Sequence, residues 1–355
     1  MQNNEYYLWG AGTYGRRIIN FMKNDLTFKA VIDNDQKKQK TLFCGLPVIS
    51  YAEAKKKLPE TKMVISLARP YAVRELLLNE GFVQNRDFYF AYDFPSKYYW
   101  SKRRLVVGNA NLIATTLCNM HCIECQSFIP IAQNYRNYTA EDIKCDVDLM
   151  FKHIDAELNI IFSCGESLLN SEALADACSH IKSKYSGRYH ALCIITNGSI
   201  IPDDGILHAF SKSNTILSIT DYPENKEVTR KLVEKCILLN VPYFINASSK
   251  EANWYEYGDP RVLLETNPER LRSRKCWTKG AAFFEGRLYM CAMQAWFNAV
   301  VEPDAREPSD VFDLRQPKTV DTIEEVFRMI SMQSELGYVS HCMRCNGMKP
   351  LVSMK

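Results

Sequence analysis

The sequence predicts an α/β protein in which helices cover parallel β-sheets. Short apolar segments of strand length alternate with longer helical segments along most of the 355 residues. Glycine-rich or polar motifs follow directly after several apolar segments, at positions where the carboxyl ends of parallel strands collect functional residues. A chain of this length favours two or three domains, and we place them at residues 1–95, 105–270 and 271–355.

Composition limits the classes of function. Apolar residues make up 46% of the chain and charged residues 24%, as in ordinary globular proteins. The net charge of +3 is too small to indicate a nucleic-acid partner or an anionic membrane surface. The first residues are polar, and no apolar run approaches the ~20 residues of a membrane span. We therefore expect a cytoplasmic protein with neither nucleic-acid nor membrane partners.

The first segment begins with a strand at residues 6–9 and a helix at 16–23, joined by the pattern Gly10-x-Gly12-x-x-Gly15. A second strand at residues 29–32 ends at Asp33. Glycines in this position allow a tight turn and a close approach of the backbone to a diphosphate at the helix N-terminus. The alternative is a glycine turn that serves strand–helix packing alone, without a ligand.

This segment resembles the Rossmann-like domain that precedes bacterial sugar O-acyltransferases and some sugar-modifying methyltransferases. The resemblance lies in Asp33-Asn34-Asp35 and Gly45-Leu46-Pro47-Val48. It implies a nucleotide sugar as ligand, bound by the three glycines and Asp33. The segment has only half the length of a full dinucleotide-binding fold, so we do not expect redox chemistry with NAD. An aromatic and basic linker should follow at residues 94–104.

The second segment should form a parallel sheet. Its predicted strands lie at residues 111–115, 158–162, 192–196, 215–219 and 243–246, and its clearest helices at 171–185 and 226–239.

Three cysteines follow the first of these strands at a C-x3-C-x2-C spacing: Cys118, Cys122 and Cys125. Such a triad can hold three irons of a cubic [4Fe–4S] cluster and leave the fourth iron open to a cofactor. A zinc site is the alternative, with His121 or a distant side chain as fourth ligand. Thirteen cysteines in a reducing compartment favour metal binding or catalysis over disulfides.

Read as Cys-Asn-x-x-Cys-x-x-Cys, with Phe128-Ile129-Pro130 downstream, this region resembles the radical S-adenosylmethionine (SAM) enzymes. The resemblance implies a partial (β/α)6 barrel of the TIM type. It also implies that SAM chelates the open iron and is cleaved to a 5′-deoxyadenosyl radical, which takes a hydrogen atom from the substrate. These enzymes usually have an aromatic residue before the third cysteine, where this chain has Glu124.

The loops after later strands match the resemblance by position. Cys164, Gly165 and Glu166 correspond to a Gly-Gly-Glu motif that holds the SAM amino group through backbone carbonyls, and Cys164 suits this role if its φ is negative. The Cys164 thiol is also a candidate hydrogen-atom donor in catalysis.

Further along, the resemblance implies that Thr196 and Asn197 face the SAM carboxylate or ribose. It places Ser218 and Asp221 near the ribose or the substrate.

The last segment carries four more cysteines: Cys276, Cys291, Cys342 and Cys345. We predict a hairpin around Gly286 and a helix over residues 319–331, with Asp321 as its N-cap. Four thiolates can bind zinc or complete a second [4Fe–4S] cluster. The order of these cysteines after the second segment resembles that of the auxiliary-cluster domain called Twitch, a shortened form of the SPASM domain. This resemblance implies a second cluster.

Together these resemblances imply an oxidoreductase or epimerase that modifies a sugar, a nucleotide sugar or a related polyol, as in bacterial glycan biosynthesis. A flavodoxin- or ferredoxin-type protein would donate the electron. Two alternatives remain at this point. One is radical modification of a peptide or protein side chain, and the other is a zinc-stabilised scaffold that binds nucleotide sugars without radical activity.

Overall fold

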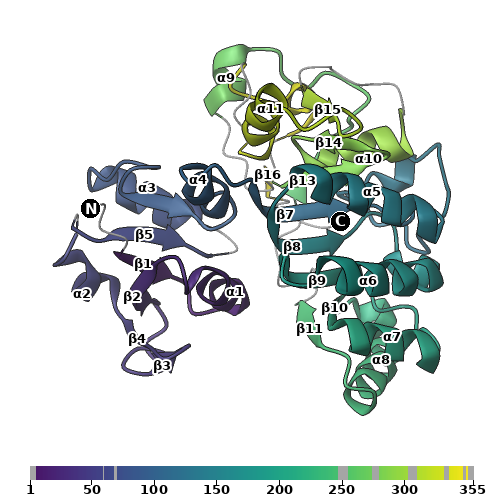
Figure 1. Ribbon diagram of the computed structural model, residues 1–355, viewed down its shortest axis with the longest axis horizontal. Coiled ribbons are helices and arrows are strands. Elements are labelled where there is room, and N and C mark those ends of the chain that lie inside the picture. The colour runs from purple at the N-terminus through teal and green to yellow at the C-terminus, as the bar shows by residue number, and fades with distance from the viewer. Residues whose placement is uncertain are drawn as a thin grey trace. The chain divides into compact units, whose positions relative to one another are not determined.

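The computed structural model describes residues 5–58, 60–67, 70–246, 255–273, 280–302, 310–331, 336–346 and 349–350. The chain divides into two compact units, Met1–Arg103 and Arg104–Lys355. Each unit is built around its own sheet with helices beside it (Figure 1), so the predicted α/β class is confirmed.

The first unit has a six-stranded sheet in the order β3-β4-β2-β1-β5-β6. All neighbours pair in parallel except β3 and β4, which are antiparallel. The chain builds outward from β1 to β4 and then crosses back to β5, so the strand order reverses beside β1. The strands are β1 (Glu5–Trp9), β2 (Thr27–Ile32), β3 (Leu42–Phe43), β4 (Leu46–Ile49), β5 (Lys62–Ile65) and β6 (Phe88–Phe90), and the helices are α1 (Thr13–Met22), α2 (Tyr51–Lys55), α3 (Tyr71–Asn79) and α4 (Phe94–Trp100).

The segment predicted as a linker contains helix α4, which packs onto the first unit. The Tyr98 hydroxyl donates to the backbone carbonyl of Asp25 at 2.6 Å, and the Tyr99 hydroxyl donates to its carboxylate at 2.6 Å. Lys102 completes this set with an ion pair of 2.9 Å to the same carboxylate. The aromatic and basic residues therefore anchor the segment to the loop after α1.

The second unit has an eight-stranded sheet in the order β11-β10-β9-β8-β7-β13-β14-β15. The strands from β11 to β13 pair in parallel, and β14 and β15 extend the sheet in antiparallel fashion. The parallel strands are β7 (Val106–Leu112), β8 (Ala156–Phe162), β9 (Tyr189–Thr196), β10 (Thr215–Thr220), β11 (Tyr243–Asn246) and β13 (Ala281–Phe284), and the antiparallel ones are β14 (Arg287–Tyr289) and β15 (Val311–Asp313).

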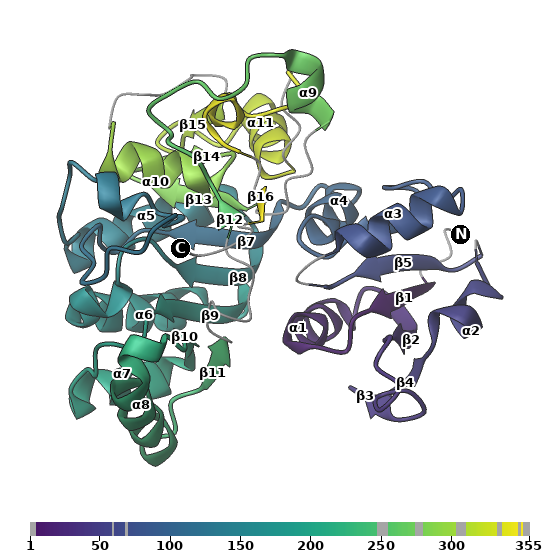
Figure 2. The same cartoon turned by 180° about the vertical axis from the view of Figure 1, so that it is seen from behind.

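Four helices connect β7 to β11 and lie along one face of the sheet (Figures 1 and 2): α5 (Ala140–His153), α6 (Ser171–Tyr185), α7 (Asp204–Ser213) and α8 (Lys226–Leu238). Strands β7 to β11 are neighbours in sequence order, which is the order of a (β/α) barrel. Leu158, Ile160 and Phe162 of β8 are fully buried and alternate with residues of the opposite face. The strand ends therefore bring the predicted motifs to one edge of the sheet.

The first strand of this unit was predicted too late in the chain. It covers Val106–Leu112, whereas the prediction placed it at residues 111–115. Gly108 and the asparagines at 109 and 111 weaken the strand pattern in the sequence. Thr116 has already left the sheet, because its N–H donates to the carbonyl of Arg136 at 2.9 Å. The other predicted strands agree with β8 to β11, and the predicted helix at 171–185 is α6.

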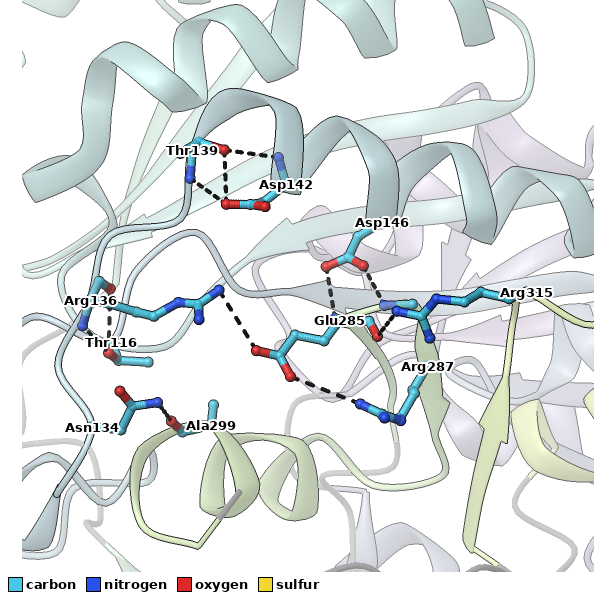
Figure 3. Close-up of polar contacts among 11 residues, drawn as sticks. Thr116, Asn134, Arg136, Thr139, Asp142, Asp146, Glu285, Arg287, Ala299 and Arg315 are labelled. Carbon is cyan, nitrogen blue, oxygen red and sulfur yellow. Dashed lines mark hydrogen bonds and ion pairs between the residues drawn. The ribbon is translucent and has the colours of Figure 1, made fainter. Parts of the chain in front are cut away.

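The predicted hairpin around Gly286 is present as β13 and β14, with Glu285 and Gly286 both at positive φ. It belongs to the main sheet of the second unit because β13 pairs with β7. The Asp146 carboxylate of α5 accepts the turn N–H groups of Glu285 and Gly286 at 3.0 and 2.6 Å (Figure 3). Arg315 donates to the carbonyl of Glu285 at 2.9 Å, so a helix and a later loop hold the turn from two sides.

The remaining described elements lie after β11. They are β12 (Tyr255–Glu256) and β16 (Lys349–Pro350), which pair with each other, α9 (Pro268–Ser273), α10 (Ala292–Val300) and α11 (Val320–Ile330). Helix α11 confirms the predicted helix, but Asp321 is not its N-cap. Thr319 is the N-cap residue. Its hydroxyl accepts the Thr322 N–H at 3.2 Å, and the Thr322 hydroxyl accepts the Thr319 N–H at 2.7 Å. Within the described residues, no helix has the length and apolar character needed to cross a bilayer.

Candidate functional site

The cysteine triad lies on the long loop between β7 and α5, and its three thiols are partly buried. Burial raises the pKa of the Cys118 thiol to about 11, and the nearby charges of Glu166 and Cys125 raise this pKa as well. Burial also raises the pKa values of Cys122 and Cys125, and a neighbouring thiol contributes at Cys122.

The thiols do not converge on one point. Among the described residues, no three His, Cys, Asp or Glu side chains are placed to hold a single metal ion. A zinc site needs four ligands around one ion at about 2.0–2.3 Å. In a cubic cluster each cysteine binds a different iron, so the thiolates need not meet.

The loop after β8 packs directly against the cysteine loop. The Glu166 N–H donates to the carbonyl of Leu117, the residue before Cys118, at 2.7 Å. A Cβ atom on Gly165 would lie 2.2 Å from the same carbonyl oxygen, so no other residue fits there without movement. This glycine is explained by the close approach of two loops.

Cys164 departs from the expectation of a negative φ, because its φ is +87°. Non-glycine residues rarely adopt this conformation, so the backbone here is strained. The side chain is buried, and burial raises the pKa of its thiol far above the ordinary range. Cys164 is therefore a protonated thiol at a position whose backbone suits glycine.

Glu166 is the centre of the hydrogen-bond network at this edge of the sheet. Its carboxylate is 1% exposed and accepts the Thr196 hydroxyl at 2.7 Å, the Asn197 N–H at 2.6 Å and the Leu168 N–H at 3.0 Å. Burial raises the pKa of Glu166, and the hydrogen bonds from Asn197, Thr196 and Leu168 oppose that shift. One buried carboxylate thus joins the loops after β8 and β9.

Thr196 and Asn197 both form hydrogen bonds with other residues of the protein. The Thr196 hydroxyl donates to Glu166 and accepts the Gly198 N–H at 3.1 Å. The Asn197 side chain donates to the Asn119 side chain at 3.0 Å, and Asn119 in turn donates to the Ser199 hydroxyl at 2.8 Å. The predicted contacts of Thr196 and Asn197 with SAM remain a prediction.

Two asparagines that sequence reasoning did not select tie the cysteine loop to the strand ends: Asn119 and Asn225. The Asn225 side chain donates to the Asn197 carbonyl at 2.9 Å and to the Met120 sulfur at 3.3 Å. The only signal for Asn119 in the sequence is its place directly after Cys118, and Asn225 has none. Side-chain hydrogen bonds between loops distant in sequence leave no local pattern.

Ser218 and Asp221 lie at the end of β10. The Ser218 hydroxyl accepts the Asn246 side-chain amide at 2.8 Å, which links β10 to β11. Asp221 lines a cavity of about 480 Å³ together with Lys226, Glu227, Thr229, Arg230, Val233 and Ile245. The cavity contains both acidic and basic side chains, and helix α8 supplies most of its lining.

Glu124, in place of the usual aromatic residue, has a structural contact. Its φ is +58°, and its carboxylate accepts the Tyr257 N–H at 2.8 Å. The side chain therefore fixes the cysteine loop to the segment around β12. Three residues after Cys125, the ring of Phe128 packs against Phe297 and His341 at centroid distances of 6.1 and 5.9 Å.

The second cysteine set is described for three of its four members, because Cys276 lies outside the described residues. Cys291 is the N-cap residue of α10, Cys342 lies in the 3-10 helix Ser340–Arg344, and Cys345 follows that helix. The rings of Phe297 and His341 pack at 5.5 Å, so α10 contacts the 3-10 helix. Cys291 and the final Cys-x-x-Cys thus lie on elements in contact.

The glycine loop of the first unit has two glycines that the fold itself requires. Gly10 has a φ of +121°, and a Cβ atom on Gly15 would lie 2.3 Å from the Gly10 carbonyl oxygen. Gly12 has ordinary backbone angles and open space around it. Burial would raise the pKa of Asp33, but hydrogen bonds from Asp35, Ala11 and Lys38 lower it. Packing therefore explains Gly10 and Gly15, while Gly12 is available for close approach of a ligand.

The sheet face opposite the helices of the second unit carries amide side chains. Asn159 of β8 donates to the side chain of Asn109 on β7 at 2.9 Å, and Asn111 donates to the Ala281 carbonyl of β13 at 3.1 Å. Glu157 lies on the same face at the start of β8 and is fully buried. Sequence reasoning did not select these residues as site residues, although Asn111 and Asn159 lay in predicted strands; Asn109 was missed because its strand was predicted to begin later.

No protein-family model matches the chain, and no curated protein matches it. Among solved structures, BtrN in complex with AdoMet and 2-DOIA aligns with a TM-score of 0.46 and 13% identity, over 67% of this chain and 92% of that chain. Native anSMEcpe with bound AdoMet aligns with a TM-score of 0.43 and 12% identity, over 64% and 82%. Streptococcus suis SuiB bound to precursor peptide SuiA aligns with a TM-score of 0.27 and 12% identity, over 52% and 46%. Likenesses of this degree carry no argument about function, which therefore rests on the residues described above.

Proposed function

We propose that this chain is a radical SAM enzyme that oxidises or epimerises a sugar, a nucleotide sugar or a related polyol. The observation that carries the proposal is the attachment of the cysteine loop to the ends of three successive parallel strands. Glu166 joins the loops after β8 and β9, and its N–H binds the residue before Cys118. Asn119 and Asn225 add contacts from the cysteine loop to the loops after β9 and β10.

The triad would hold a [4Fe–4S] cluster, with SAM on the open iron beside residues 164–166 and 196–197. When bound, this pair supplies a 5′-deoxyadenosyl radical that removes a hydrogen atom from the substrate. The protein holds the loops in register through Glu166, whose 1% exposure keeps water away from its hydrogen bonds. The second cysteine set, Cys276 with Cys291, Cys342 and Cys345, would hold an auxiliary [4Fe–4S] cluster that accepts or passes an electron.

The partly buried amides of Asn109 and Asn111, on the sheet face opposite the helices, support a substrate rich in hydroxyl groups. Asn109, Asn111 and Asn159 line adjacent strands there, and an amide can both donate to and accept from a hydroxyl. The mixed charges of the cavity at Asp221 suit a polar ligand in the same way. A flavodoxin- or ferredoxin-type protein is the proposed electron donor.

The first unit is the proposed binding site for a nucleotide sugar. Gly12 leaves open space at the N-terminus of α1, next to the Ala11 N–H that binds Asp33 at 3.0 Å. A diphosphate could approach the backbone there, while Asp33 accepts a ribose hydroxyl.

The test is anaerobic reconstitution of the chain with iron and sulfide, followed by incubation with SAM, a strong reductant and a panel of nucleotide sugars and free polyols. We expect a brown protein with about eight irons per chain and formation of 5′-deoxyadenosine. A substrate should increase the yield and appear as an oxidised or epimerised product. A colourless protein that binds zinc and leaves SAM intact would refute the proposal and support a zinc-stabilised scaffold.

A further inference from the structure

The backbone of Tyr257 is hydrogen-bonded to both cysteine segments. Its N–H donates to the carboxylate of Glu124 at 2.8 Å, and Glu124 directly precedes Cys125 of the triad. Its carbonyl accepts the N–H of Asn346 at 3.0 Å, and Asn346 directly follows Cys345 of the second set. Tyr257 itself is buried. Two hydrogen bonds on one buried residue therefore join cysteines that lie far apart in the chain.

The segment around Tyr257 is also attached to the final Cys-x-x-Cys. The carbonyl of Met343 accepts the Leu264 N–H at 2.8 Å. The Arg344 side chain donates to the carbonyl of Pro260 at 3.2 Å. Met343 and Arg344 are the two residues between the cysteines of this motif. A displacement of the motif would therefore break several hydrogen bonds to the segment that holds Tyr257.

Two more contacts lead from the cysteine loop to the elements of the second set. The ring of Phe128 packs against His341, which directly precedes Cys342, at a centroid distance of 5.9 Å. The Gln133 N–H donates to the carbonyl of Val300, the last residue of α10, at 2.6 Å. The N-cap residue of α10 is another cysteine of this set. The cysteine loop thus contacts a neighbour or the helix of each described cysteine of the second set.

Glu124 makes the polar part of this connection at a strained point of the loop. Its φ of +58° lies in a region that non-glycine residues rarely adopt, and surrounding contacts must hold such a conformation in place. A hydrogen bond from an N–H group to a carboxylate is charge-assisted and about twice as strong as a neutral one. The bond to Tyr257 therefore fixes the backbone beside Cys125 as well as the segment that reaches the second set.

We propose that Glu124 is a positioning residue that couples the two cysteine sets through Tyr257, so that a cluster bound at one set stabilises a cluster at the other. This inference rests on the proposed function, since it requires that both sets bind clusters. A cluster that orders one segment also orders its partner through the two hydrogen bonds of Tyr257. The coupling acts equally in both directions, because the binding free energies of coupled sites are linked.

The first experiment uses the metal-free, full-length protein and iodoacetamide as a thiol probe. It compares wild type, Glu124→Ala, Glu124→Gln and the control Ile123→Ala, which removes a side chain of the same loop that is 73% exposed. Mass spectrometry of peptides gives the alkylation rate of Cys345, a residue that is 9% exposed. We expect Glu124→Ala to raise this rate about fivefold, near the lower limit of typical couplings between sites. Glu124→Gln and Ile123→Ala should keep the wild-type rate, because an acceptor oxygen remains at position 124.

The second experiment uses protein reconstituted with iron and sulfide and then exposed to an iron chelator. Alkylation of Cys122 reports loss of the triad cluster, because a thiolate bound to iron is protected from the probe. Cys345→Ala removes a ligand of the second set, and it should speed this loss about fivefold when Glu124 is present. The same substitution should have no further effect in the Glu124→Ala background, because the connection is already broken there.

Cys178, a fully buried cysteine of α6, serves as the internal control for folding and should keep its slow alkylation rate in every variant. An equal rise at Cys178 and Cys345 would mean that the whole unit opens, and it would overturn the inference. Equal rates at Cys345 in wild type and Glu124→Ala would overturn it too, as would an effect of Cys345→Ala that is the same in both backgrounds. Those results leave the proposed function intact if wild type takes up iron and cleaves SAM, whereas a wild type without iron would refute that function and the coupling of clusters with it.

Discussion

The Glu166 carboxylate accepts a hydrogen bond from the Thr196 hydroxyl at 2.7 Å and lies close enough to Cys118 to raise the pKa of its thiol. These residues come from loops after three different strands. A single buried carboxylate therefore fixes the loops after β8 and β9 in register and stands next to the cysteine triad. The predictions below begin with this carboxylate.

Glu166→Gln should destabilise the second unit. The variant replaces one carboxylate oxygen with an NH2 group, which cannot accept the Asn197 N–H or the Thr196 hydroxyl that the oxygen accepts now. A buried donor left without its acceptor costs about 1–3 kcal/mol of unfolding free energy. Chemical denaturation should show this loss, whereas Glu172→Gln on the exposed face of α6 should change the free energy little. Equal stability of both variants would contradict the role assigned to Glu166.

Cys118→Ala should remove about half of the iron from the reconstituted protein and abolish formation of 5′-deoxyadenosine. The reason is that three thiolates hold the SAM-binding cluster, and two leave it open to loss. Cys178→Ala is the matched control, because Cys178 is a buried cysteine of α6. The measurements are iron content and nucleoside analysis. An unchanged iron content in Cys118→Ala would mean that the triad does not bind a cluster.

Cys164→Gly should be tolerated. Glycine adopts a φ of +87° without strain, so relief of about 1 kcal/mol offsets the loss of the small buried side chain. Cys193→Gly on β9 should lower the free energy of unfolding by about 2 kcal/mol, because no backbone strain is relieved there and glycine weakens a strand. Denaturation curves of both variants decide the matter, and a larger loss for Cys164→Gly would show that its thiol makes an essential contact. If SAM cleavage persists but product formation stops, the thiol is the hydrogen-atom donor.

Glu157→Gln should change the pH dependence of stability. Neither carboxylate oxygen of Glu157 has a hydrogen-bond partner, and complete burial raises its pKa well above 4.5. Because the pKa is higher in the folded state, the folded chain binds more protons than the unfolded chain between the two pKa values. The free energy of unfolding therefore falls as pH rises through that range, by up to about 1.4 kcal/mol per pH unit.

The glutamine variant does not titrate, so its stability relative to that of wild type should increase as the pH rises above 4.5. Denaturation of both proteins at several pH values measures the difference. A constant difference across this range would show that the pKa of Glu157 is not raised in the folded chain, because a partner stabilises its charge.

Local sequence patterns determined the main elements of this protein. The alternation of apolar strands and helices predicted the α/β class, β8 to β11 and helix α6, because period and burial are written into neighbouring residues. The spacing of Cys118, Cys122 and Cys125 identified the metal-binding candidate for the same reason. The local pattern did not predict the bounds of β7, because Gly108 and two asparagines interrupt its apolar residues. Pairing with a strand on each side stabilises β7 in the sheet.

Tertiary structure alone decided how the site is held together. Glu124 accepts a backbone N–H, and Cys164 has a positive φ. Both features depend on segments that are distant in the chain. The contacts of Glu166 with Thr196 and of Asn225 with Asn197 cross between loops in the same way. Their free energy comes from burial and hydrogen bonding between residues that only the folded sheet brings together, so no local spacing records them.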